Sequence, residues 1–478
     1  MMDRLEKFES YQRQRIAHYQ RLAVHLDHYR AGQAYRKRLR EIYAFVIPPH
    51  SSVLEVGCGQ GDLLAAMNPS RGVGIDFSEE MICRARAKYP QLTFDCCDAH
   101  QFIAGETFDA IILSDLVNDL WDVQTVLENV KKACHPGTRI ILNSFSRVWQ
   151  LPLQAAEKLG LARPNLAQNW LTPHDLVNLL DLCGFQVIRK REEILLPLPV
   201  PGIAAFFNKF LARFWLINQL TLTNFYVARP ESSLKDGQTA PSISVIVPAR
   251  NEAGNIAEIF RRVPEMGSGT ELIFVEGHST DNTYAVIEEE MRRHPQRPCR
   301  LFKQQGIGKA DAVRLGFENA RGDILSILDA DLTVAPEDLP RFYQAIVSGK
   351  GELINGVRLV YPLEGKAMQF LNILGNKFFS SLISWLLDQP VKDTLCGTKV
   401  MWRSDYEHLV KNRAYFGDFD PFGDFDLIFG SAKLNLKILD LPVRYGERVY
   451  GTTNIQRWRH GALLLRMAAF AARRIKFV

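Results

Sequence analysis

The sequence predicts an α/β protein with two domains, each built on a mostly parallel sheet. The chain has 478 residues, of which 47% are hydrophobic and 23% charged. This is ordinary globular composition at a length beyond that of a single core. Short apolar segments alternate with helical stretches in two successive runs, as is typical of parallel strands joined by helices. Between the runs, residues 229–242 are rich in Ser, Gly, Pro and charge, which indicates a linker.

The expected elements follow one another along the chain. Residues 1–47 carry apolar and aromatic side chains at helical spacing, including Tyr35, Leu39, Ile42 and Tyr43, and are expected to form leading helices. The domains are then expected at 48–230 and 243–455, with the linker at 231–242 and a tail at 456–478. In the first domain we expect strands at 53–56, 72–75, 110–113, 139–143, 185–190 and 223–228, with an apolar insert at 194–222. In the second we expect strands at 243–247, 272–275, 300–303 and 324–328.

Composition argues against several classes of protein. Eight cysteines without a Cys-x-x-Cys pair argue against a disulfide framework or a zinc cluster and fit a reducing cytoplasm. The N-terminal residues are polar and predict no secretory signal. The longest apolar window, 203–227, is interrupted by Lys209, Arg213, Asn218 and Asn224, so no membrane span is predicted. A net charge of +5 does not by itself indicate nucleic acid. We expect a cytoplasmic protein, soluble or peripheral on the inner face of the plasma membrane.

The first predicted site lies where strand 53–56 ends in the segment EVGCGQG. Its glycines, Gly57, Gly59 and Gly61, let the backbone approach a ligand closely. The next strand ends in Asp76, where nucleotide-binding βαβ units place a carboxylate for a ribose diol. Because open α/β sheets bind ligands at the carboxyl ends of their strands, these positions outline an adenosine pocket. Two further polar residues follow the third and fourth strands, Asp98 and Ser114.

Four segments of this half, VLEVGCGQGDLL, GIDFSEEM, FDCCDAH and FDAIILSDLV, resemble the successive motifs of class I methyltransferases over residues 40–230. The resemblance implies a Rossmann-like sheet and S-adenosyl-L-methionine as the cofactor. It implies that the three glycines face the methionine moiety and that Glu55 supports their loop. It also implies that Asp76 binds the ribose hydroxyls, that Asp98 binds the adenine amine and that Ser114 lines the same pocket.

Two other interpretations of this half stay open, an NAD-type fold and a pocket retained as scaffold. Methyl transfer needs proximity and in-line geometry, and only sometimes a base. His100, His135 and His174 are candidate bases by residue type alone, so none is assigned.

The second predicted site lies at the end of strand 324–328, which runs into Asp329 and Asp331. Mg²⁺ and Mn²⁺ prefer oxygen ligands and bridge one or two carboxylates to the phosphates of a nucleotide. Such an ion would neutralise a departing diphosphate. An Asp-x-Asp pair alone is commonly a solvated surface feature, but here polar groups also follow two neighbouring strands, at 248–252 and 276–281.

The segments VIVPARNEAGNI, ELIFVEGHSTDNT, GIGKADAVRLGFENARGD and LDADL resemble, in order, the motifs of family 2 glycosyltransferases with the GT-A fold over residues 243–455. The segment DTLCGTK at 393–399 is similar to one in the dolichyl and polyprenyl-phosphate mannose synthases. The resemblance implies a nucleotide-diphospho-sugar donor and a glycan, glycolipid or polyprenyl-phosphate acceptor. It assigns the metal to Asp329 and Asp331. It lines the donor pocket with Pro248, Arg250, Glu252, Glu276, Asp281, Lys309, Asp329 and Arg448.

An inverting transfer to a hydroxyl needs a carboxylate that takes the proton, and the segment PFGDFDLIFG offers two. Aligned to the Glu-Asp-x-Asp pattern of the family, the base is Asp424; counted back from the Leu-Pro pair at 441–442, it is Asp426. A phosphate acceptor is already ionised and needs no base, and these carboxylates would then bind metal, orient the sugar or sit at a helix N-terminus.

The end of the chain departs from the synthase pattern. Asn454 stands where the synthases carry a lysine, which argues against a lipid-phosphate acceptor. Residues 457–478 hold no acidic side chain and alternate basic with apolar residues. This pattern is typical of a basic amphipathic helix, which would lie on an anionic membrane surface or pack on its own domain.

Three functions are consistent with these patterns. The first is a bifunctional enzyme of cell-surface glycan or glycolipid assembly, in which one domain transfers a sugar and the other methylates a glycan or its precursor. The second is a glycosyltransferase with a non-catalytic, methyltransferase-like scaffold domain. The third, an RNA-modifying methyltransferase, fits poorly with the second domain, and no nucleic-acid partner is expected.

Overall fold

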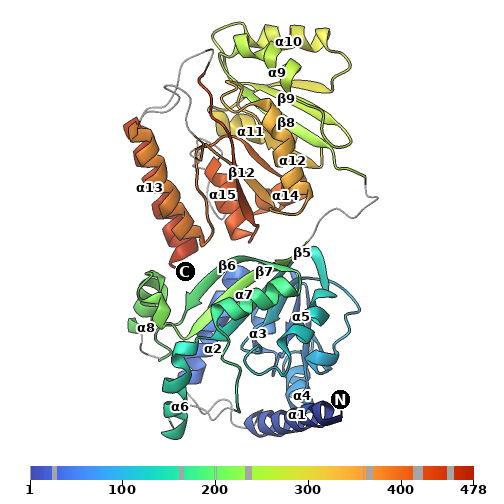
Figure 1. The fold of residues 1–478 in the computed structure, drawn as a ribbon, viewed down its shortest axis with the longest axis vertical. Helices are drawn as coiled ribbons and strands as arrows, with labels where there is room; N and C mark the ends of the chain where they lie inside the picture. The colour runs from blue at the N-terminus through green and yellow to red at the C-terminus, as the bar shows by residue number, and fades with distance from the viewer. Residues whose placement is uncertain are drawn as a thin grey trace. The chain divides into compact units, whose positions relative to one another are not determined.

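The computed structural model describes residues 2–23, 30–160, 166–198, 200, 202–231, 239–358, 360–361, 370–412, 424–448, 450 and 457–478. The chain divides into two compact units, Met1–Glu231 with Phe477–Val478 and Ser232–Lys476. Figure 1 traces the first unit from blue to green and the second from yellow-green to red. Within the predicted linker, residues 232–238 lie outside the described residues.

A seven-stranded sheet forms the centre of the first unit, in the order β3-β2-β1-β4-β5-β7-β6. Its strands are β1 (Ser52–Val56), β2 (Arg71–Asp76), β3 (Thr93–Cys96), β4 (Phe108–Leu113), β5 (Cys134–Phe145), β6 (Phe185–Glu193) and β7 (Thr223–Pro230). The first five strands are parallel, whereas β7 is antiparallel to both β5 and β6. The strand segments expected from the sequence are therefore confirmed, including the final two that close the sheet.

Helices cover both faces of this first sheet (Figure 1). One face packs against α5 (Val123–Lys131) and α7 (Pro173–Leu182). The opposite face packs against α2 (Arg30–Val46), α3 (Asp62–Ala66) and α4 (Glu79–Lys88). The strands are apolar on both faces for this reason, as is typical of a parallel sheet between two helical layers.

Capping side chains fix where these helices begin. The Asp122 carboxylate accepts a hydrogen bond from the Thr125 backbone N–H at the start of α5. A capping box between Thr172 and Asp175 starts α7, with Pro173 in its first turn. The other helical elements of this unit are α1 (Met2–Ala23), η2 (Ala99–Gln101), η3 (Arg147–Trp149), α6 (Gln150–Lys158), α8 (Ile203–Ala205), η4 (Phe206–Phe210), η5 (Leu211–Arg213) and η6 (Asn218–Leu220).

The second unit has its own seven-stranded sheet, in the order β10-β9-β8-β11-β13-β12-β14. Its strands are β8 (Ile243–Ala249), β9 (Thr270–Glu276), β10 (Cys299–Lys303), β11 (Ile324–Ile327), β12 (Leu353–Val357), β13 (Lys399–Trp402) and β14 (Ile438–Pro442). The four strands from β8 to β11 are parallel and correspond to the four predicted segments. Strand β13 is antiparallel and lies between β11 and β12.

Helices also cover both faces of the second sheet. One face packs against α9 (Ile256–Arg262), α10 (Thr283–Arg293) and α12 (Leu339–Val347). The other packs against residues of five further helices, α11 (Lys309–Glu318), α13 (Phe370–Leu387), α14 (Arg403–Lys411), α15 (Asp424–Lys433) and α16 (Arg457–Ala471). Short helical turns complete the unit: η7 (Ala253–Asn255), η8 (Pro336–Asp338) and η10 (Ala472–Lys476).

The predicted C-terminal helix is present as α16 and η10, and its apolar side is buried in the second unit. Leu464, Met467, Ala468, Ala471 and Ile475 all belong to the core cluster that also contains residues of α13. Of the two expectations for this helix, packing on its own domain agrees with this burial. A separate search of the described residues finds no helix long and apolar enough to cross a bilayer.

We expect Gly61→Ala to destabilise the first unit. Gly61 has a φ of 77°, and an added Cβ would lie 2.6 Å from the Phe94 ring. Strain and overpacking of this kind cost about 1–3 kcal/mol, measurable as faster amide hydrogen exchange in β1 and β2. Gly105→Ala is the matched control, because no atom lies within 4 Å of its added Cβ. Equal exchange rates in the two variants would contradict the packing around Gly61.

Candidate active sites

A cavity of about 680 Å³ opens at the carboxyl ends of the central strands of the first sheet. The strand order changes direction between β1 and β4, and open α/β sheets bind ligands at this kind of position. Six of the predicted cofactor residues line this cavity: Glu55, Gly57, Gly59, Asp76, Asp98 and Ser114. Gly61 does not line it and lies instead at the N-cap of α3.

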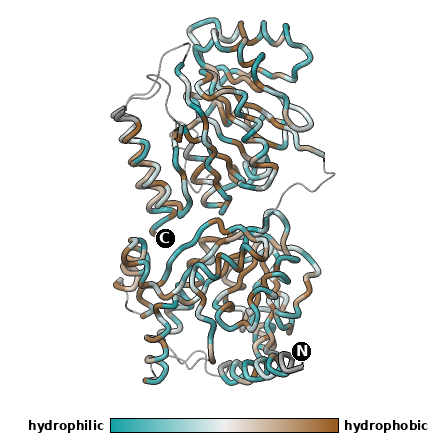
Figure 2. Tube along the Cα trace, in the orientation of Figure 1, coloured by the Kyte–Doolittle hydropathy of each residue, from teal (hydrophilic) through white to brown (hydrophobic). Residues whose placement is uncertain are grey.

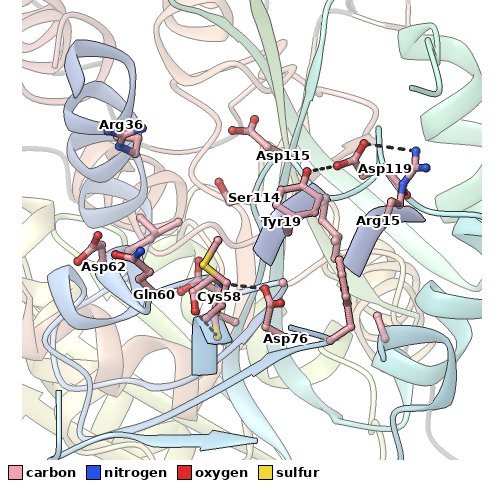
Figure 3. A pocket seen from close by; sticks show the side chains of 18 of the residues that line it. Arg15, Tyr19, Arg36, Cys58, Gln60, Asp62, Asp76, Ser114, Asp115 and Asp119 are labelled. Atoms are coloured by element: carbon pink, nitrogen blue, oxygen red, sulfur yellow. Dashed lines mark hydrogen bonds and ion pairs between the residues drawn. The ribbon is translucent and has the colours of Figure 1, made fainter. Parts of the chain in front are cut away.

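The Asp76 carboxylate joins the glycine loop to the end of β2. Its Oδ2 accepts a hydrogen bond from Gly59 N and its Oδ1 accepts one from Ser78 N, both at 2.9 Å. Burial raises the pKa of Asp76, although both N–H donors act in the opposite direction. A carboxylate has about four acceptor positions, so two are left for hydroxyl groups of a ligand. Figure 3 shows Asp76 at the cavity with Cys58 beside it.

Glu55 is buried behind the same loop. Its Oε2 accepts a hydrogen bond from Leu64 N at 2.9 Å, within α3. Burial raises the pKa of Glu55 to about 8, more than that hydrogen bond lowers it. Glu55 is therefore largely protonated at neutral pH, and its hydrogen bond with Leu64 N joins β1 to α3.

Asp98 follows β3, lines the cavity and is part of a small polar network. Its Oδ1 accepts hydrogen bonds from His100 N at 2.8 Å and pairs with His100 Nδ1 at 2.7 Å. Its Oδ2 accepts a hydrogen bond from Gln12 Nε2. Burial raises the pKa of Asp98, but the hydrogen bonds from His100 and Gln12 outweigh it and the net shift is downward. Asp98 is thus an ionised acceptor at this end of the cavity.

Helix α1 supplies one wall of the cavity. Tyr11, Gln12, Arg15 and Tyr19 line it from successive turns of this helix. Arg15 donates to the Asp119 carbonyl oxygen at 2.9 Å and stacks over the Tyr11 ring at 4.0 Å. Figure 3 shows Arg15 and Tyr19 directed toward Asp119. These contacts fix α1 against loops of the sheet more than 100 residues away in the chain.

In the second unit, Asp329 follows β11 and pairs with Lys309 at the start of α11, with 2.5 Å between Oδ1 and Nζ. Although burial raises its pKa, the Lys309 ammonium holds the pKa of Asp329 below its usual range. Gly397, from the DTLCGTK segment, packs on this ion pair. A Cβ at position 397 would overlap Asp329 Oδ2 and Lys309 Nζ. The three predicted features of this edge therefore meet at one place.

Asp331 is held by different partners. Its Oδ2 pairs with Arg448 Nη2 at 2.5 Å, and its Oδ1 accepts a hydrogen bond from Thr333 Oγ1 at 2.8 Å. Burial raises the pKa of Glu252 to about 7, and the nearby Asp331 charge contributes to the shift. Glu252, Asp331 and Arg448 thus interact electrostatically at this edge, as expected if they line one pocket.

The other predicted residues lie at the ends of β8 and β9 and in the loops that follow these strands. Pro248 lies within β8 and the exposed Arg250 follows it. Glu276 ends β9, and its Oε1 accepts a hydrogen bond from Ser279 N at 2.5 Å. Asp281 accepts a hydrogen bond from Thr283 N at 3.0 Å, and its other carboxylate oxygen accepts one from Ala253 N at 3.5 Å. Burial raises the pKa of Asp281, but these hydrogen bonds outweigh it and keep the carboxyl ionised.

The structure describes the side chain of only one of the two candidate bases, Asp426. The side chain of Asp424, the first residue of α15, lies outside the described residues, as does the segment 451–456 that contains Asn454. Asp426 is buried, and its Oδ2 lies 3.6 Å from Arg314 Nη2 of α11. The assignment of the base to Asp424 or Asp426 stays a prediction.

A buried ion pair anchors the DTLCGTK segment. The Asp393 carboxylate accepts two hydrogen bonds from the Arg358 guanidinium, at 2.7 and 2.9 Å, and one from Asn376 Nδ2 at 2.9 Å. Burial raises the pKa of Asp393, but Arg358 outweighs it and keeps the carboxyl ionised. The pair connects the end of β12 and helix α13 to the loop that carries Gly397.

The described residues contain no group of three or more His, Cys, Asp or Glu side chains that could hold a metal ion by themselves. The carboxylates of Asp329 and Asp331 would leave coordination positions of such an ion for a substrate or water. Mg²⁺ commonly binds in this way, through one or two carboxylates together with substrate phosphates.

Comparison with known proteins assigns each of the two domains to a protein family. Residues 26–190 match the model of a methyltransferase domain, and residues 244–410 match that of glycosyl transferase family 2. The chain carries a methyltransferase domain followed by a family 2 glycosyltransferase domain. The Rossmann-like and GT-A α/β folds predicted from the sequence are thereby confirmed.

Individual relatives resemble only part of the chain. A dolichol-phosphate mannosyltransferase of Pyrococcus furiosus is 35% identical over 218 residues, which are 45% of this chain and 59% of that protein. An undecaprenyl-phosphate 4-deoxy-4-formamido-L-arabinose transferase of Edwardsiella ictaluri is 27% identical over 222 residues, 46% of this chain and 64% of that protein. The chain thus spans about three fifths of the length of these relatives. Among solved structures, glucosyl-3-phosphoglycerate synthase of Mycobacterium tuberculosis is 20% identical, with a TM-score of 0.36 over 51% of this chain and 86% of that one.

Sequence reasoning did not identify the wall that α1 provides to the methyltransferase domain. Its residues were expected only to form leading helices. The available signal was the placement of Tyr11, Arg15 and Tyr19 four residues apart, which puts aromatic and cationic groups on one helix face. In the glycosyltransferase domain, the buried pair of Arg358 and Asp393 was also not predicted, because its members lie 35 residues apart.

We expect Glu55→Gln to change how the stability of the methyltransferase domain depends on pH. The folded-state pKa of about 8 lies above the unfolded value, so the wild type loses stability as pH rises from about 5 to about 8. The variant lacks this titration, and its unfolding free energy should rise relative to the wild type by up to about 1.4 kcal/mol per pH unit. Urea unfolding across this range measures the difference. A difference that stays flat across this range would contradict the buried, protonated state of Glu55.

We expect Gly397→Ala to weaken nucleotide binding by the glycosyltransferase domain at least about tenfold, because the added Cβ displaces Asp329 and Lys309. Calorimetric titration with a nucleoside diphosphate and Mn²⁺ measures the effect. Gly375→Ala in α13 is the matched control, since no atom lies within 4 Å of its added Cβ. Wild-type affinity in Gly397→Ala would show that this ion pair has no part in binding.

Proposed function

We propose that the chain is a bifunctional enzyme of cell-surface glycan or glycolipid assembly. In this proposal the glycosyltransferase domain transfers a sugar, with inversion and with a divalent metal, from a nucleotide-diphospho-sugar. The methyltransferase domain transfers a methyl group from S-adenosyl-L-methionine to a glycan or its precursor. The observation that carries the proposal is that each domain has its own carboxylates at the ends of parallel strands, Asp76 in one and Asp329 with Asp331 in the other.

The residues around the first cavity fit S-adenosyl-L-methionine. Gly59 has a φ of 51°, and nothing lies within 4 Å of the position of its missing Cβ, so the backbone is open toward a ligand. Asp76 has acceptor positions left for ribose hydroxyls, and Asp98 is an acceptor suited to the adenine amine. The cofactor supplies an activated methyl group on sulfur. The protein would hold it beside the acceptor, which is the main requirement of methyl transfer.

The residues of the second site fit a hard divalent ion together with a nucleotide. Asp329 and Asp331 provide oxygen ligands, and Lys309 and Arg448 now neutralise them. A nucleotide diphosphate would give these two cations new partners and would also complete the ligands of the ion. Bound there, the metal would neutralise the departing diphosphate. Glu252, Glu276 and Asp281 would line the donor pocket with Pro248 and Arg250.

The proposed acceptor of the sugar is inferred from the names of the relatives rather than from the geometry of the second site. Two relatives carry names of transferases that act on dolichol phosphate or undecaprenyl phosphate. A polyprenyl phosphate is therefore the acceptor class we propose, even though Asn454 stands where the synthases carry a lysine, and a glycan or glycolipid hydroxyl is the alternative. For a hydroxyl acceptor, Asp424 or Asp426 would take the proton; for a phosphate acceptor no base is required.

We expect two independent sites in a calorimetric titration of the full chain. S-adenosyl-L-methionine should bind with unit stoichiometry, and a nucleoside diphosphate should bind only in the presence of Mn²⁺ or Mg²⁺. Asp329→Ala with Asp331→Ala should weaken nucleotide binding at least about 100-fold and leave S-adenosyl-L-methionine binding unchanged, because the two carboxylates lie in the other domain. Asp76→Ala should have the reverse effect.

Each variant is thus the control of the other. If S-adenosyl-L-methionine does not bind while the nucleotide does, the first domain is a scaffold and the chain is a glycosyltransferase alone. If neither ligand binds to the folded chain, the proposed bifunctional activity is wrong.

A further inference from the structure

The insert between β6 and β7 of the methyltransferase domain has an unusual distribution of polar and apolar side chains. Residues 194–222 contain no Asp or Glu, and their only charged residues are Lys209 and Arg213. The described part consists of the short helical elements α8, η4, η5 and η6. Figure 2 shows the stretch around α8 largely in brown. The question is which side of these elements faces the domain.

Two polar side chains of the insert, Asn208 and Arg213, are buried. Asn208 is only 7% exposed, and its amide group donates to Leu196 O at 2.9 Å and accepts from Leu196 N at 2.7 Å. Arg213 is 3% exposed, with its Nη1 at 2.7 Å from Glu193 Oε1 and bonded to Glu192 O. Arg213 thus attaches the insert to the end of β6, and Asn208 fixes the local fold of the insert through its contacts with Leu196.

A cluster of buried charges holds this attachment. Glu193, the last residue of β6, is surrounded by the guanidinium groups of Arg38, Arg191 and Arg213 at 3.3, 3.2 and 2.7 Å. Although burial opposes ionisation, the three cations lower the pKa of Glu193 to about 2. Removing one partner from a buried ion pair leaves an uncompensated charge, so the cluster fixes the orientation of the insert.

Many large apolar side chains of the insert are exposed, whereas Ile194, Ala212 and Leu222 are buried. Phe206, Phe210 and Phe214, four residues apart, are 52%, 40% and 39% exposed. The Phe206 and Phe210 rings stack, with 5.5 Å between centroids. Trp215 is 74% and Leu216 66% exposed. Three other residues of the insert are about half exposed, Leu198, Ile203 and Leu220.

This arrangement is the reverse of what water favours. An exposed Phe or Leu side chain gives up roughly 1.5–3 kcal/mol of burial free energy, and soluble proteins seldom expose contiguous apolar patches of this kind. Because polar contacts hold Asn208 and Arg213 on the inner side of the insert, the exposed aromatic and aliphatic side chains stay on its outer side and form an apolar patch. Its outer surface therefore suits an apolar medium. The insert itself combines Phe and Trp with Lys209 and holds no acidic residue, although Lys209 Nζ lies 4.0 Å from Glu41 Oε2 of α2. This composition is typical of segments at a lipid interface.

We propose that the insert at 194–222 is the surface by which the protein rests on an anionic lipid bilayer, with the aromatic side chains in the headgroup region and Lys209 near the lipid phosphates. This places membrane contact on the methyltransferase domain rather than on the C-terminal helix, whose apolar side is buried. It does not depend on either transfer reaction, because it is argued from the exposed side chains of the insert alone.

Flotation of the full chain with vesicles tests the proposal. The wild type should float with vesicles of equal parts phosphatidylglycerol and phosphatidylcholine, and less with phosphatidylcholine alone. The triple variant Phe206→Ser, Trp215→Ser and Leu216→Ser should reduce the vesicle partition coefficient at least about tenfold. Trp215→Phe should also reduce the blue shift of tryptophan fluorescence that anionic vesicles produce.

The matched control is a second triple variant in which three exposed apolar residues elsewhere in this unit are replaced by Ser. Ile103, Val177 and Leu182 are 86%, 39% and 63% exposed. Val177 and Leu182 belong to α7, on the face of the sheet opposite to α2. This control should bind vesicles within about twofold of the wild type. Amide hydrogen exchange outside the insert should be unchanged in both variants, which separates lost binding from lost folding.

Three outcomes would overturn the proposal: a wild type that does not float, an insert variant that floats as well as the wild type, or equal losses in the insert variant and the control. A further one would identify a different occupant. If the insert variant changes the mass of the protein in solution from dimer to monomer and no form binds vesicles, the patch is covered by a second copy of the chain.

Discussion

The cost of removing carboxylates from water at the ends of buried strands is the constraint on which both domains depend. A parallel sheet covered by helices offers a carboxylate at its edge little solvent, so each one needs N–H donors or a cation. Asp76 uses the backbone of Gly59 and Ser78, whereas Asp329 uses Lys309. The two solutions have different chemical consequences. Backbone donors fix a loop permanently, but a lysine side chain can exchange one anionic partner for another.

Much of the fold and many of the candidate residues could be predicted from the sequence because they follow from local pattern. Apolar runs that end in glycine or carboxylate located the strands and placed Asp76 and Asp329 at their carboxyl ends. The pairing of these residues could not be predicted in the same way. Arg448 and Asp331 lie 117 residues apart, and only the folded chain brings them together. Gly61 illustrates the opposite case, since its motif position suggested ligand contact and its actual place is at the start of a helix.

The insert and the C-terminal helix show why composition alone does not reveal which face of a segment is exposed. Both combine apolar with basic residues and lack acidic ones. In the C-terminal helix, Met467 and Ile475 find a core to fill. In the insert, the polar contacts of Asn208 and Arg213 take the inward positions and leave the aromatic rings outside. Which side of such a segment is buried depends on the residues that it contacts elsewhere in the fold, and the local sequence pattern does not contain them.

The position of α1 has a consequence for the order in which the methyltransferase domain is assembled. Arg15 bonds to Ala167 O, 152 residues further along the chain. Closing a loop of that length is entropically costly and raises the contact order of the domain. Helix α1 can therefore make this contact only after the chain as far as Ala167 has been synthesised. The wall that α1 gives to the cavity thus rests on long-range contacts, whereas other parts of the lining belong to the strand ends of the sheet.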